Sequence, residues 1–139
     1  FFVSGLLQEL HERGGQGLGL PFALPAEQRA QFPFSERPML ISEICRILNE
    51  MADPFVYRKL RTTTITNWLL HAGFLEVSAR EGGTPTRRPT ALGRTIGLSA
   101  EERSGKRGTY TVTLYGPEAQ RFILDNLDAM LSSESQPLG

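Results

Sequence analysis

The chain has 139 residues, with fifteen basic and fifteen acidic side chains and an apolar fraction of 40%. This length can bury one hydrophobic core, and no apolar run approaches the roughly 18–20 residues that span a bilayer. The single cysteine, Cys45, excludes an intramolecular disulfide and a cysteine-cluster zinc site. A reducing, cytoplasmic setting without membrane association is expected.

The N-terminal 39 residues are predicted to form an arm. Apolar side chains at helical spacing predict a short helix in residues 1–12, and the Gly- and Pro-rich residues 14–25 predict a loop. Residues 26–32 can form one or two helical turns before a second break at 33–38. The opening residues have neither an initiator Met nor the basic leader of a signal peptide, so we expect a trimmed chain or a part of a longer protein.

The middle of the chain shows two amphipathic helical patterns. The first covers residues 41–51, includes Cys45 on its apolar face, and stops at the Asp-Pro that follows. Residues 55–60 are expected to form a short second helix, and residues 62–72 a third. One of the leading threonines is expected to cap the third helix and Gly73 to close it. The predicted core face of the third helix comprises Ile65, Trp68, Leu69 and Ala72.

Strands are predicted in the second half of the chain. Residues 74–80 alternate weakly and 109–115 alternate clearly, so both predict strands. Between them we expect a turn-rich basic segment at 81–89, a short helix that begins after Thr90, and a polar loop at 99–108.

A final helix is expected from Pro117 onward. Its apolar positions form a line that we call the C-terminal seam. The seam either completes the core or pairs with a second copy of the chain as a homodimer contact. Its members are Phe122, Ile123, Leu127, Met130 and Leu131.

Charge is distributed unevenly along the chain. Residues 56–111 hold ten basic and four acidic side chains, a net of +6, and the remainder holds five and eleven, a net of −6. A basic segment of this kind favours a polyanionic partner. No arrangement typical of a catalytic, metal or cofactor site is visible, because the two histidines, His11 and His71, lie in unrelated contexts. The sequence therefore predicts a protein that is not an enzyme and needs no cofactor.

The run ISEICRILNEM at 41–51, followed by TTTITNWLLHAGFLE at 62–76, resembles the second and third helices and first wing strand of a winged helix-turn-helix domain. RRPTALGRTIGL at 87–98 resembles a pattern in C-terminal domains of phage antirepressor-type proteins. The resemblance covers about residues 40–115 and implies an α+β, winged-helix-like fold. We expect this domain to include residues 40–132, preceded by the arm and followed by a disordered tail at 133–139. About thirty residues separate the two predicted strands, so a small helix or second motif must fill the gap.

The resemblance also implies binding of nucleic acid, and of double-stranded DNA in particular, by a bacterial transcription regulator or a domain of a larger protein. The helix at 62–72 would enter the major groove, with Asn67 as a base reader and the basic residues as phosphate contacts. The alternative is a protein–protein interaction or dimerisation module that has the same fold and binds no nucleic acid. The predicted nucleic-acid-binding residues are Arg58, Lys59, Arg61, Thr63, Thr64, Thr66, Asn67, Arg80, Arg87 and Arg88.

Overall fold

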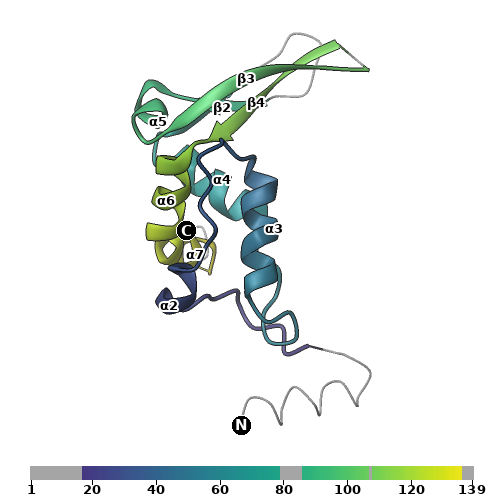
Figure 1. The fold of residues 1–139 in the computed structure, drawn as a ribbon, viewed down its shortest axis with the longest axis vertical. Coiled ribbons are helices and arrows are strands. Elements are labelled where there is room, and N and C mark those ends of the chain that lie inside the picture. The colour runs from purple at the N-terminus through teal and green to yellow at the C-terminus, as the bar shows by residue number, and fades with distance from the viewer. Residues whose placement is uncertain (1–16, 79–85, 107, 136–139) are drawn as a thin grey trace. The chain divides into compact units, whose positions relative to one another are not determined.

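The structure is a computed structural model, which describes residues 17–78, 86–106 and 108–135 (Figure 1). The described chain is mixed α+β, as predicted. Its helices are α2 (Ala26–Arg29), α3 (Ile41–Met51), α4 (Thr62–His71), α5 (Ala91–Thr95), α6 (Pro117–Asp125) and α7 (Leu127–Ser135). Its strands are β1 (Leu75–Ser78), β2 (Thr86–Pro89), β3 (Leu98–Gly105) and β4 (Gly108–Tyr115).

The chain divides into two compact units. The first contains residues 17–32 and Cys45–Leu60, and the second contains Pro33–Ile44 and the described residues from Arg61 onward. The predicted helix at 1–12 lies outside the described residues. The predicted boundaries after residues 39 and 132 stay a prediction.

In the first unit, the glycine-rich loop runs beside the segment that follows α3. Leu18 donates its amide hydrogen to the Phe55 carbonyl at 2.7 Å, and Arg58 donates to the Leu20 carbonyl at 2.8 Å. The loop approaches closely here, because a Cβ on Gly17 would lie 2.9 Å from the Phe55 carbonyl oxygen. The predicted helix at 55–60 is wrong, because this segment forms a turn and a single bridge, from Tyr57 to Leu20. Its backbone groups are thus paired without a helix.

Asn49 fixes the segment that leads out of the first unit. Its side-chain amide donates to the Leu60 carbonyl at 3.0 Å, and its Oδ1 accepts from the Leu60 N–H at 2.7 Å. The Asn49 side chain thus donates and accepts a hydrogen bond as the backbone of a paired strand residue does.

The predicted helix at 41–51 is confirmed with the same bounds, and Ile44 and Leu48 on its apolar face are fully buried.

In the second unit, the strands form two separate antiparallel pairs. Strand β1 pairs with β2 from Leu75↔Pro89 to Ser78↔Thr86, and β3 pairs with β4 from Leu98↔Tyr115 to Gly105↔Gly108. The predicted loop at 99–108 is therefore wrong over β3, and the predicted turn segment at 81–89 is wrong over β2. The sequence correctly required a further motif between the two predicted strands: β2, α5 and β3 fill that interval.

Gln120 joins three parts of the second unit although it is a polar residue with no exposed surface. Its Oε1 accepts from the Ser35 N–H at 2.8 Å, and its Nε2 lies within hydrogen-bonding distance of the Ser35, Arg37 and Tyr115 carbonyls. Next to it, Met39 and Tyr115 exchange two backbone hydrogen bonds, of 2.9 and 2.7 Å. The segment before α3 is thereby attached to the end of β4 and to α6.

The predicted C-terminal helix is two helices. Pro117 opens α6 as expected, but the helix ends at Asn126, whose side chain donates to the Phe122 carbonyl at 2.8 Å. A side chain that bonds to its own helix backbone competes with continuation of the helix. In the C-terminal seam, Ile123, Leu127 and Met130 are buried within the single chain, which favours its role in the core.

Cys45 is buried, as predicted, and desolvation raises the pKa of its thiol from 9.0 to about 12. No helix within the described ranges combines the length and apolar character needed to cross a membrane.

We expect Gln120→Leu to lower the free energy of unfolding by about 2–4 kcal/mol, because it leaves buried backbone groups without partners. Urea titration followed by the fluorescence of Trp68, the only tryptophan, measures this. The control is Gln28→Leu on the exposed surface of α2, which should change stability by no more than about 0.5 kcal/mol. Equal effects of the two substitutions would contradict a structural role for the Gln120 amide.

We expect the Cys45 thiol to make stability fall with pH above 9.0, its ordinary pKa. The unfolded thiol loses its proton there and the folded thiol keeps it until about pH 12, so the unfolded state gains about 1.4 kcal/mol per pH unit. Urea titrations at stepped pH measure the slope. Cys45→Ala should show a shallower fall, and identical slopes would refute the raised pKa.

Candidate nucleic-acid interface

Helix α4 presents one polar stripe to solvent. Its residues Thr63, Asn67 and His71 are spaced four apart and all are exposed. The opposite face carries Ile65 and Leu69, which have no exposed surface. The helix contains no acidic residue, so the stripe presents hydroxyl, amide and imidazole groups without a carboxylate of its own.

Two of the threonines predicted to bind nucleic acid are buried. Thr64 and Thr66 each keep only 7% of their surface exposed, which contradicts the exposure that such binding requires. Both flank Ile65, so the buried face of α4 is wider than its apolar residues alone indicate. Conversely Ala72, predicted in the core, is exposed. Trp68 is half-buried and stacks with Phe74 at a centroid distance of 6.4 Å.

The two ends of α4 are formed by different means. Arg61 is the N-cap residue and makes no side-chain capping bond, so the predicted cap by Thr62 or Thr63 is wrong. The C-terminal end is as predicted, because Gly73 follows the helix with φ +88°, a left-handed conformation that glycine adopts without strain. The chain then turns directly into β1.

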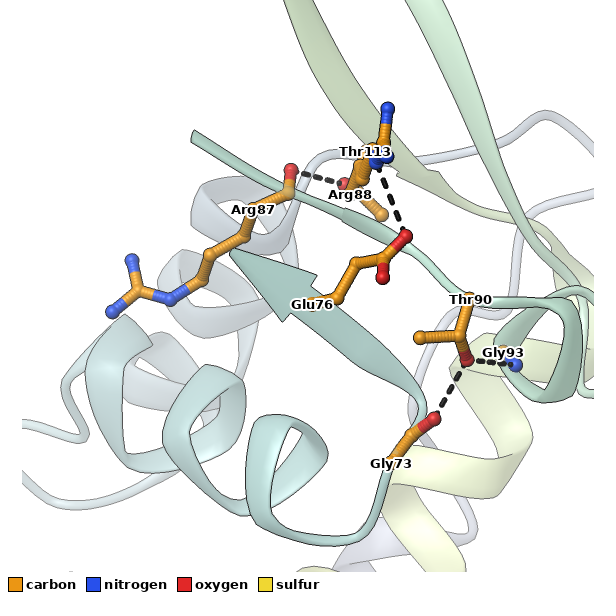
Figure 2. A network of polar contacts seen from close by, with 7 residues as sticks. All are labelled: Gly73, Glu76, Arg87, Arg88, Thr90, Gly93 and Thr113. Carbon is orange, nitrogen blue, oxygen red and sulfur yellow. Dashed lines mark hydrogen bonds and ion pairs between the residues drawn. The ribbon is translucent and has the colours of Figure 1, made fainter. Parts of the chain in front are cut away.

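The β1–β2 hairpin holds Arg87 and Arg88 on opposite faces. Arg88 is paired with Glu76 across the strands, and its Nε lies 3.1 Å from Glu76 Oε1. Figure 2 shows the Arg87 side chain extending away from this pair, toward α4. Successive strand residues point to opposite faces, which explains the divergence.

Arg87 and Asn67 connect the hairpin to the polar stripe. The Arg87 guanidinium donates to Asn67 Oδ1 at 3.4 Å, and both side chains are exposed. Thr113 Oγ1 in turn donates to the Arg87 carbonyl at 3.2 Å, so β2 is also bonded to β4 (Figure 2). The structure therefore brings Thr63, Asn67 and Arg87 into one exposed surface, which we call the α4–β2 surface.

The other predicted residues are distributed as follows. Arg58 and Lys59 are exposed and belong to the first unit, whereas Arg61 is exposed in the second unit next to the stripe. Arg80 lies outside the described residues.

Charges on the β3–β4 hairpin are mixed rather than uniformly basic. Arg103 pairs with Glu101 at 3.1 Å, and Glu102 lies exposed between them. A second pair, Arg88–Glu76, also lies inside residues 56–111, so both pairs use acidic residues that the net of +6 already includes. Such exposed pairs are weak and can exchange partners.

Thr90 and Gly93 fix the hairpin to the end of α4. The Thr90 hydroxyl donates to the Gly73 carbonyl at 2.6 Å and accepts from the Gly93 N–H at 3.0 Å (Figure 2). The predicted cap of the short helix is confirmed, since Thr90 is the N-cap of α5. The link to Gly73 has no signal in the sequence, because the two residues are seventeen positions apart.

Within the described ranges, no group of three or more His, Cys, Asp or Glu side chains is placed to hold a metal ion.

We expect Gly93→Ala to destabilise the protein by about 1–3 kcal/mol, because the added Cβ would overlap the carbonyl oxygen of Phe74. Leu92→Ala, at the exposed neighbouring position on α5, is the control, and should have a much smaller effect. Thermal unfolding of both variants measures the difference. A Gly93→Ala protein as stable as the parent would show that α5 does not lie against the start of β1.

Comparisons of the chain with protein-family models, with curated proteins and with solved structures find no match.

Proposed function

We propose that the second unit binds double-stranded DNA as a winged-helix-like module, with α4 in the major groove and the β1–β2 hairpin as its wing. The observation that carries the proposal is the hydrogen bond between Arg87 and Asn67. It places a cationic side chain beside the amide of a helix stripe that has no carboxylate. A base-reading amide next to a phosphate-binding guanidinium is the combination that such a docking needs.

The helix end supports the same proposal. The start of α4 carries the positive end of the helix dipole, and Arg61 at the N-cap adds a further positive charge there. A cation at this end is unfavourable in the isolated protein. A DNA phosphate bound there would turn the repulsion into attraction, so Arg61 belongs to the proposed contact.

The proposed contact set is smaller than the predicted one. It comprises Arg61, Thr63, Asn67, Arg87 and Arg88. Arg88 would have to exchange Glu76 for a phosphate, and the exposed pair is worth about 0–1 kcal/mol. The buried Thr64 and Thr66 are not part of the set. The cytoplasmic location, the bacterial origin and a role in transcription stay predictions that belong to this proposal.

A protein-binding role is the second candidate. It is favoured by a half-buried aromatic cluster in which Phe122 lies 6.2 Å from Trp68 and 5.0 Å from Phe74, measured between ring centroids. Aromatic side chains with exposed edges are common in protein interfaces. Pairing of two copies through the C-terminal seam is less favoured, because most of the seam is already buried.

The test is a salt titration of binding to random duplex DNA. Each phosphate contact contributes about −0.9 to the slope of log K against log salt, so Arg87→Gln should weaken binding and reduce the slope by about one. Arg121→Gln on α6 removes the same charge from the same unit and should leave the slope unchanged.

Asn67→Ala separates base reading from phosphate binding. It should reduce the preference for a selected site while leaving random-sequence affinity nearly unaffected. Absence of duplex binding by the parent protein at low salt would overturn the proposal and favour the protein-binding role.

A further inference from the structure

A pocket of about 280 Å³ lies within the second unit and adjoins the exposed stripe of α4 at Thr63. It is formed by the start of α3, the start of α4 and the strands β1, β2 and β4. Pockets for drug-sized ligands begin near 300 Å³, so this volume suits a small molecule. It is too small for a nucleotide with its sugar and base enclosed.

Two helices begin at the pocket. Its lining includes Ile41 and Ser42, the first residues of α3, and Thr62 and Thr63, the first residues of α4. The first N–H groups of a helix have no partner inside the helix, and no side chain caps α4. Backbone N–H groups at these two helix starts are therefore available to an anion.

Thr66 provides an independent indication of a ligand. Its side chain lines the pocket and is more than nine-tenths buried, with 7% of its surface exposed. Among the residues that the structure describes, none forms a hydrogen bond with its hydroxyl. No fully enclosed side-chain nitrogen or oxygen in these residues lacks a partner, so the Thr66 hydroxyl oxygen keeps some accessible surface, and the residue lines the pocket. The hydroxyl of a mostly buried side chain normally has a partner, and a ligand in the pocket would supply it.

The charged side chains of the lining indicate whether the ligand is an anion or a cation. Among the described residues that line the pocket, Arg87 is the only charged side chain and none is a carboxylate. Glu43, near the start of α3, has its carboxylate bound to the Leu40 N–H at 3.0 Å. An anionic group near Arg87 would thus meet no acidic side chain in the lining.

The rest of the lining is apolar. Leu75 and Tyr115 are buried, and Val112 and Leu40 are half-buried. An inorganic anion would leave these surfaces without contact, whereas a short hydrocarbon or aromatic body would cover them. We propose that this pocket binds a small organic anion: an apolar body of a few carbons that carries one carboxylate or phosphate group, held by Arg87, the Thr66 hydroxyl and the two helix starts.

The test is isothermal titration calorimetry of the protein without DNA, using 3-methylbutanoate, phenyl phosphate and inorganic phosphate as separate probes. We expect at least one organic probe to bind more tightly than inorganic phosphate. The two organic probes distinguish a carboxylate-selective from a phosphate-selective pocket, and either outcome supports the proposal. Inorganic phosphate binding as tightly as both organic probes, or no binding of any probe at millimolar concentration, overturns it.

Two substitutions in the pocket lining and one control test where the probe binds. Arg87→Gln should weaken the organic probe by about tenfold, the expected effect of losing a hydrogen bond to a charged group. Arg94→Gln, at an exposed position of α5 in the same unit and not among the lining residues, is the matched control and should bind as the parent does. Thr66→Val keeps the side-chain volume and removes the hydroxyl, and it should also weaken binding. Equal affinity in all three variants would place the ligand elsewhere and overturn the proposal.

This proposal goes beyond DNA binding and does not depend on it. The calorimetry contains no DNA, so its failure leaves the duplex titration unaffected. Conversely, a protein that binds the organic probe and no duplex would keep the pocket and lose the proposed DNA-binding role.

Discussion

The side-chain amide of Gln120 accepts from the Ser35 N–H and offers its two hydrogens to three backbone carbonyls, and the geometry of the second unit depends on these contacts. They bind the extended segment before α3 to the end of β4 and to the first turns of α6. Met39 and Tyr115 also exchange two backbone hydrogen bonds, and these hold the start of α3 against the end of β4. The pocket exists because of this attachment, since its walls come from segments far apart in the sequence.

Arg87 belongs to both proposed sites, and this has a physical consequence. Its backbone is fixed by the pairing with Val77 and by the Thr113 hydroxyl, whereas its guanidinium is exposed and donates to the neutral amide of Asn67. One guanidinium cannot give its full set of charged hydrogen bonds to two anions at once. If both proposals hold, a bound organic anion and a DNA phosphate compete for it, and the coupling is reciprocal. Such a coupling would make the duplex affinity sensitive to a small metabolite.

The sequence predicted the bounds of α3, the start of α6 and the end of α4 because their signals are local. The periodic apolar face of α3 and the proline that opens α6 act within a few residues, as does the positive φ available to Gly73. Strand β3 was missed because its sequence, LSAEERSG, is polar on both faces. It is a strand because β4 pairs with it along its whole length. The residue pattern of β3 alone does not reveal that such a partner strand is present. The segment at 55–60 was misassigned for the same reason, since its backbone bonds go to the loop near Leu20.

The candidate site was predictable only in part, and the reason is again distance along the chain. The exposed stripe of α4 follows from helical spacing, so Thr63 and Asn67 were found where they lie. The contact from Asn67 to Arg87 spans twenty positions and depends on the register of the β1–β2 hairpin. A shift of one residue in that register would send Arg88 toward α4 and Arg87 toward solvent on the other face.

Thr66 shows how a polar residue can mislead a reading of the helix face. By composition it belongs with the other threonines of α4, and its hydroxyl suits a phosphate oxygen. The structure buries it at the edge of the pocket. In the proposed pocket site the same hydroxyl would bind a small anion instead of a DNA phosphate. Burial, which depends on the strands packed beside α4, thus removes Thr66 from the surface that a macromolecule would contact.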